Sequence, residues 1–194
     1  NASWWLLPLA LRLRKQGFVT ELFDYSSLRE GPQRALPRLI ERLHAQPPNA
    51  LVGHSLGGLM VLEALRHAPL LPIKRVVCLG SPLLGSQIAR TLAAHGWGRP
   101  LLGRSATLLQ QGLVQWEGAA AVGLVAGNVA RGLGHMFVRF DGGSDGTVAI
   151  AETLLPGLAD HCVVRSSHTG LVLSRDAARQ TGHFLHHGQF APTS

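Results

Sequence analysis

The most constraining stretch of the sequence is residues 50–59, which read ALVGHSLGGL. A short apolar run, typical of a buried strand, passes through Gly-x-Ser-x-Gly into an apolar run of helical length that ends at Leu65. We expect glycine at Gly53 and Gly57 because strand and helix pack closely there. Ser55 then occupies a strained turn at the carboxyl end of a strand.

The composition indicates a single globular domain over residues 1–194. Hydrophobic residues make up 46% of the chain and charged residues 15%, which is enough to bury a core without disulfides or metal. The longest apolar candidate for a membrane span, Gly118–Gly134, is rich in glycine and alanine and is interrupted by Arg131. We therefore predict no transmembrane segment.

The formal charge of +7 could indicate a nucleic acid or an anionic lipid surface as partner. Its distribution favours solvated helix faces, since Arg34, Arg38 and Arg42 recur at every fourth position of one predicted helix. No basic strand with interleaved aromatic residues accompanies them. We predict no nucleic-acid binding, and an anionic lipid surface stays open as a partner.

The two cysteines fall in different predicted strands, with another strand between them. Cys78 and Cys162 should then lie about 9 to 10 Å apart, too far for a disulfide. Buried thiols favour a cytoplasmic location over secretion. No signal peptide is visible, but the chain begins within the fold, so an earlier signal stays open.

Predicted helices and strands alternate along the chain. Helices are predicted over Ser3–Gln16, from Gly31 up to Pro47, and over Leu56–Leu65, Ser86–His95 and Ser174–His187. Strands are predicted over Phe18–Tyr25, Ala50–Val52, Ile73–Gly80, Ala119–Ala126 and His161–Arg165. This alternation predicts an α/β fold of three αβα layers, with a mostly parallel sheet and ligands at the carboxyl ends of its strands.

A serine hydroxyl becomes a nucleophile only when a base accepts its proton and an acid orients that base. His168 is the favoured base, because it follows the last strand in a loop of small residues, whereas the other histidines lie in the serine turn, at a strand start or on helices. Asp145 is the favoured acid for Ser55, in a glycine-flanked loop before that strand. Asp141 and Asp160 remain alternatives.

Other chemistry-bearing residues carry weaker signals. His183 and His187 lie one helical turn apart, but no carboxylate or cysteine pattern accompanies them, so we predict no metal site and no cofactor. Large aromatic side chains more often belong to the core than to a pocket. Four tryptophans are nevertheless candidates for lining an acyl pocket: Trp4, Trp5, Trp97 and Trp116.

Four motifs, in this order, resemble the α/β-hydrolase superfamily and, within it, the small bacterial esterases and lipases. They are Val52–Gly58, Leu79–Pro82 followed by Gly85-Ser86, Ser144–Val148 and Ser167–Gly170. The resemblance covers nearly the whole chain. It implies the hydrolysis of carboxylic esters through an acyl-enzyme intermediate.

The same resemblance implies roles for individual residues. Ser55, Asp145 and His168 would form a catalytic triad, and the backbone amide of Leu56 would stabilise the oxyanion. Residues 83–117 would correspond to the cap or lid that binds the acyl chain in such enzymes. A thioesterase or acyltransferase with the same triad, and a non-catalytic hydrolase-like module, remain alternatives.

One feature of the family is missing from this sequence. The family has a central strand ending in His-Gly directly before the helix predicted over residues 3–16, and that strand lies between those predicted over residues 18–25 and 50–52. Without it, these two strands would sit about 9 to 10 Å apart. We therefore expect this chain to be a fragment of a longer hydrolase that lacks its amino-terminal strands and its second oxyanion donor.

Overall fold

A parallel β-sheet forms the middle layer of the protein. The computed structural model describes residues 2–24, 31–94, 106–130 and 143–192. The sheet has the order β1-β2-β3-β4, and every neighbouring pair is parallel. Its strands are β1 (Ala50–His54), β2 (Arg75–Leu79), β3 (Ala121–Gly127) and β4 (Asp160–Val164). The carboxyl ends of all four strands therefore lie along one edge.

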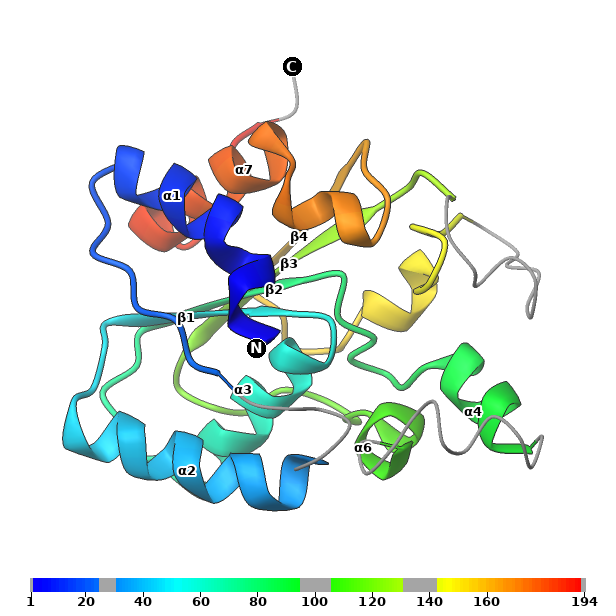
Figure 1. Cartoon of the computed structure of the whole chain (residues 1–194), viewed down its shortest axis with the longest axis horizontal. Helices are drawn as coiled ribbons and strands as arrows, with labels where there is room; N and C mark the ends of the chain where they lie inside the picture. Colours follow the sequence, from blue (N-terminus) through cyan, green and yellow to red (C-terminus); the bar gives the residue numbers. More distant parts are fainter. Residues whose placement is uncertain (1, 25–30, 95–105, 131–142, 193–194) are drawn as a thin grey trace.

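Helices cover both faces of this sheet (Figure 1). One face carries the 3₁₀ helix η1 (Ala2–Leu6), α1 (Leu7–Lys15) and α7 (Arg175–His187), and the other carries α2 (Gly31–Ala45) and α3 (Leu56–His67). Shorter helices follow in the connections: α4 (Gln87–Ala94), α6 (Ala106–Gln111), η4 (Ile150–Thr153) and η5 (Thr169–Val172). The predicted three-layer α/β fold is confirmed.

Side chains of β2 divide the core into two halves. Val76 and Cys78 pack with residues of α3, whereas Val77 and Leu79 pack with residues of α1 and α7, including Phe184. All five residues have no exposed surface. A strand that is apolar on both faces belongs inside an α/β sandwich, because successive side chains point to opposite faces.

Both predicted ends of α7 and the predicted start of α4 are also confirmed. The Ala177 amide donates a hydrogen bond of 3.1 Å to Ser174 Oγ at the start of α7, and Gly188, with φ of 78°, follows its end. The Ala89 amide donates to Ser86 Oγ at 3.2 Å at the start of α4. Polar amino-terminal caps and a left-handed carboxyl-terminal glycine satisfy backbone groups that the helix cannot.

The strand predicted over Phe18–Tyr25 is wrong for its described part, residues 18–24. These residues have no strand structure, and none of the four strands pairs with them. A strand exists only where a neighbour supplies the hydrogen-bond ladder. Phe18 and Phe23 instead pack their rings against the two core clusters, and Val19 is fully exposed.

Both cysteines are free and buried, as expected. Cys78 lies on β2 and Cys162 on β4, with β3 between them, so the predicted separation by one strand is confirmed. Burial raises the pKa of each thiol to about 12. Such thiols are almost entirely protonated at neutral pH and are therefore poor nucleophiles.

The glycines that allow α3 to approach the sheet differ in part from our expectation. A Cβ on Gly53 would lie 2.5 Å from the Gly58 nitrogen, so Gly53 is required as predicted. A Cβ on Gly57 would meet nothing within 4 Å, which overturns that expectation. The tight contact belongs to Gly58, whose added Cβ would lie 2.1 Å from Ser81 Oγ.

Within the described ranges, no helix combines the length and the apolar character needed to cross a membrane.

We predict that Gly58→Ala destabilises the protein and that Gly57→Ala does not. The alanine at position 58 overpacks the contact with Ser81, which should lower the free energy of unfolding by about 1 to 3 kcal/mol. At position 57 the methyl group has space, and alanine favours a helix by about 0.5 to 1 kcal/mol. Urea unfolding followed by circular dichroism measures both changes. Equal destabilisation of the two variants would contradict this account of the contact.

Candidate active site

Ser55 forms the connection between β1 and α3. Its backbone has φ of 55° and ψ of −124°, and it is the one non-glycine residue with positive φ among the described residues. The Ser55 amide donates to the Leu79 carbonyl of β2 at 2.9 Å, which fixes the turn to the sheet. A non-glycine residue in this conformation costs about 1 to 3 kcal/mol and is retained where surrounding contacts enforce it.

The structure brings the three predicted site residues together at this turn. His168 Nε2 lies 3.0 Å from Ser55 Oγ, and His168 Nδ1 lies 2.7 Å from Asp145 Oδ2. Because a carboxylate only accepts hydrogen bonds, Nδ1–H donates to Asp145. Nε2 is then left to accept the hydroxyl hydrogen of Ser55.

Asp145 is held by its own loop. Its Oδ1 accepts hydrogen bonds from the amides of Thr147 at 2.9 Å and Val148 at 2.7 Å. Its backbone carbonyl accepts from the amide of His168 at 2.9 Å. The carboxyl group is buried, with only 1% of Asp145 exposed. This carboxylate therefore keeps both its orientation and its contact with His168 without competition from water.

Two glycines allow the loops after the strands to meet. The sequence interpretation included Gly80 in a motif without assigning it this role, and it did not single out Gly127. Gly80, directly after β2, has φ of 53°, and an added Cβ would lie 3.1 Å from Asp145 Oδ2 and 2.7 Å from a Leu171 methyl carbon. At the end of β3, a Cβ on Gly127 would lie 2.4 Å from the Ser166 carbonyl oxygen. Side chains at either position would push the Asp145 and His168 loops apart.

His54 also belongs to the site, although the sequence interpretation set it aside as part of the turn. Its Nε2 lies 3.0 Å from the backbone carbonyl oxygen of His168, and the two imidazole rings have centroids 4.8 Å apart. Burial, followed by the nearby His168, lowers the pKa of His54 to about 4. The sequence feature that could have indicated a role for His54 is its position directly before Ser55.

The alternative acids do not join this site within the described residues. Asp160 stands at the amino end of β4, on the opposite edge of the sheet from Ser55, and its Oδ2 accepts from the Phe190 amide at 2.6 Å. Asp141 lies outside the described residues.

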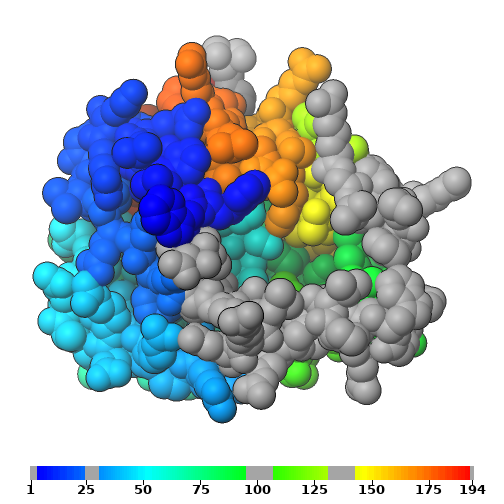
Figure 2. All heavy atoms as spheres, viewed as in Figure 1, coloured from blue at the N-terminus to red at the C-terminus, as the bar shows by residue number. Residues whose placement is uncertain are grey.

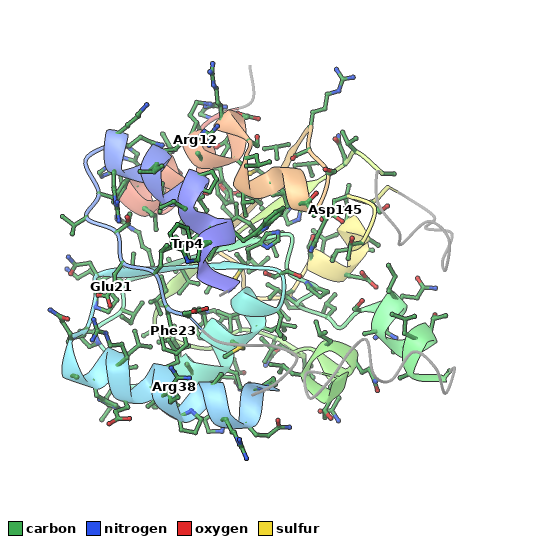
Figure 3. The ribbon with its side chains drawn as sticks, in the orientation of Figure 1. Trp4, Arg12, Glu21, Phe23, Arg38 and Asp145 are labelled. Carbon is green, nitrogen blue, oxygen red and sulfur yellow. The ribbon has the colours of Figure 1, made fainter. Side chains whose placement is uncertain are left out.

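The predicted tryptophans are dispersed. Trp116 is buried and donates its Nε1–H to the Ala120 carbonyl at 2.9 Å, at the amino end of β3, so the structure does not bring it to Ser55. Trp4 and Trp5 lie on η1 with exposed fractions of 69% and 48%. Figure 3 labels Trp4 on this amino-terminal helix. Trp97 lies outside the described residues.

The described residues contain no group of three or more histidine, cysteine, aspartate or glutamate side chains arranged to hold a metal ion. His183 and His187 on α7 place their rings 4.4 Å apart, and His183 Nδ1 contacts the Gln189 carbonyl at 2.9 Å.

Comparison with known proteins identifies the fold. No protein-family model and no curated protein sequence matches the chain. Among solved structures, the mature Bacillus licheniformis lipase BlEst2 aligns with a TM-score of 0.65 and 21% identity, covering 91% of this chain and 82% of the lipase. A metagenomic carboxyl esterase aligns with a TM-score of 0.59 and 19% identity over 81% of this chain and 62% of the esterase.

A phospholipase from Legionella pneumophila, PlaB, aligns with a TM-score of 0.62 and 14% identity. The alignment covers 93% of this chain and 53% of the phospholipase. The chain thus has the α/β-hydrolase fold, as the sequence motifs predicted. It spans 82%, 62% and 53% of these three proteins, respectively.

We predict that the protein loses stability as the pH falls from about 6.5 to about 4, in part because of His54. In the unfolded chain this imidazole binds a proton near its ordinary pKa of 6.5, whereas the folded protein keeps it neutral down to about pH 4 beside His168 and Asp145. His54→Gln removes this titration and should weaken the pH dependence. Urea unfolding of both proteins at several pH values tests this, and an unchanged slope would contradict it.

Proposed function

We propose that this protein is a serine hydrolase that cleaves carboxylic esters, as an esterase or lipase, through an acyl-enzyme on Ser55. The observation that supports this most is the unbroken hydrogen-bonded series from Ser55 Oγ through His168 to Asp145, with distances of 3.0 and 2.7 Å. The series lies at the carboxyl edge of the sheet, where α/β folds bind their ligands.

In the proposed reaction Ser55 Oγ attacks the ester carbonyl while His168 Nε2 accepts its proton. The imidazolium then gives that proton to the departing alcohol, which leaves an acyl group on Ser55. Water, activated by the same Nε2, releases the acid and restores the serine. Asp145 keeps Nδ1 protonated and stabilises the positive charge on His168 throughout.

The backbone amide of Leu56 is the proposed donor to the oxyanion. Leu56 is the first residue of α3 and directly follows Ser55. Amides in the first turn of a helix lack partners within the helix and form the positive end of its dipole. A tetrahedral intermediate on Ser55 would place its negative oxygen close to this amide.

Apolar residues near Ser55 favour a hydrophobic acyl group. Leu56 and Met60 of α3 form a small buried cluster with Ala35 of α2, and Leu108 and Leu109 of α6 pack against it. Helix α6 lies inside residues 83–117, the proposed lid segment. The named activities of the structural neighbours, a lipase, a carboxyl esterase and a phospholipase, agree with cleavage of ester bonds.

A thioesterase or an acyltransferase would use the same three residues. The preferred leaving group or acceptor separates these reactions from ester hydrolysis, so initial rates on matched ester and thioester substrates, with and without an added alcohol, distinguish them. A non-catalytic module would fail to react with any of them.

We predict that Ser55→Ala abolishes hydrolysis of short p-nitrophenyl esters and labelling by a fluorophosphonate probe, because only an activated serine reacts with that probe. Asp145→Asn should lower kcat by roughly 10³- to 10⁴-fold, since the amide favours the wrong histidine tautomer. Ser174→Ala, which removes the cap of α7, is the matched serine control and should keep both activities.

Two results would contradict the proposal. Ester turnover that persists in folded Ser55→Ala would remove Ser55 from the reaction, and a wild-type protein inert to both ester and probe would support the non-catalytic alternative.

We also propose that the outer face of η1 and α1 contacts anionic lipid. Trp4 of η1 and Leu11 of α1 are exposed, at 69% and 47%, and the last turn of α1 carries Arg12 and Lys15. These two basic side chains and Arg175 line an open groove of about 600 Å³. Figure 2 shows the helices η1 and α1, in dark blue, on the face of the molecule that is turned to the viewer. Exposed tryptophan with flanking basic residues is typical of helices that lie at a lipid interface.

For this face we predict that the protein co-sediments with phosphatidylglycerol vesicles and much less with phosphatidylcholine vesicles. The double variant R12E/K15E should lose most of this binding, because it reverses two charges on the face. R66E is a control on α3, outside the groove. Equal binding to both lipids, or equal loss in control and double variant, would contradict the proposal.

A further inference from the structure

His54 links the turn that carries Ser55 to the loop that carries His168. Its Nε2 lies 3.0 Å from the backbone carbonyl oxygen of His168, a residue 114 positions further along the chain. Because a carbonyl oxygen only accepts hydrogen bonds, His54 must carry its proton on Nε2. The bond therefore fixes the tautomer of His54.

The donor is anchored in the sheet. His54 is the last residue of β1, and its backbone pairs with Leu79 of β2. Ser55 follows it directly, and the Ser55 amide donates to the Leu79 carbonyl. The nucleophile turn and the His54 imidazole are thus carried by one rigid strand end.

Apart from the contact of Nε2 with Ser55 Oγ, two further hydrogen bonds join His168 to Asp145. The His168 amide donates to the Asp145 carbonyl at 2.9 Å, and Nδ1 donates to its carboxylate. These contacts orient His168 relative to Asp145, whereas the bond from His54 joins the His168 backbone to the strand bearing Ser55. The His54 ring also lies against the His168 ring, with an interplanar angle of 44°, which restricts its movement.

We propose that His54 is a positioning residue, which holds the backbone of His168 so that Nε2 stays aligned with Ser55 Oγ while the proton moves. This inference rests on the proposed hydrolase function. Its physical basis is that proton transfer requires hydrogen-bond distance, and a displacement of about 1 Å can lower a rate about 100-fold. His54 remains a neutral donor at pH 7, so it adds no positive charge beside the imidazolium that forms on His168.

The test compares three substitutions that separate the ring from its N–H. His54→Phe keeps a ring but removes the donor. His54→Gln can place an amide N–H where Nε2 lies, and His54→Asn carries the same group on a side chain that is one methylene shorter. We expect kcat for a p-nitrophenyl ester to fall about 10-fold in the phenylalanine and asparagine variants, with KM within about 2-fold, and glutamine to restore most of the loss.

His161→Phe is the matched control. His161 Nε2 also forms a hydrogen bond, with Thr153 Oγ1 at 2.8 Å, but His161 lies on β4, away from Ser55. Its kcat should stay within about 2-fold of the wild type. Thermal unfolding checks that each variant is folded. If His54→Phe is not folded, the comparison of kcat between His54→Gln and His54→Asn tests the positioning role.

Wild-type kcat in folded His54→Phe, or equal kcat in the glutamine and asparagine variants, would overturn the positioning role. A wild-type protein that neither cleaves the ester nor reacts with a fluorophosphonate probe would instead overturn the proposed function. The same probe applied to each variant separates slow activation of Ser55 from weak binding of the ester, since the labelling rate should follow kcat.

Discussion

Parallel pairing of the four strands is the constraint on which the rest of the structure depends. It puts the carboxyl ends of β1, β3 and β4 on one edge, so the chain segments that follow them meet there. Ser55, Asp145 and His168 are far apart in sequence, but each follows one of these strands. An antiparallel arrangement would send at least one of them to the opposite edge.

The sequence was sufficient for the parts of the fold that depend on local pattern. Periodicity placed Ser55 between an apolar strand and an apolar helix. Chain order placed Asp145 and His168 in loops that follow later strands. The structure brings these three residues together. The strand expected at residues 18–24 could not be judged locally, because a strand depends on a partner that another part of the chain must supply.

Contacts between segments distant in sequence could not be predicted from the local sequence pattern either. Gly57 and Gly58 are indistinguishable in a Gly-x-Ser-x-Gly-Gly motif, and only the position of Ser81 reveals which of them lies against another segment. The hydrogen bond from His54 to the loop of His168 has the same character. The local sequence indicates which residues could take part in chemistry. The tertiary packing determines which other residues contact them and fix their positions.

The burial of Cys78 and Cys162 has a consequence for covalent reagents. With pKa values of about 12, both sulfurs stay in the thiol form across the ordinary working range, and neither offers the thiolate that alkylating agents and oxidants need. Preparations of this protein should therefore tolerate air without added reductant. Alkylating reagents should likewise leave Cys78 and Cys162 largely unmodified while the protein is folded.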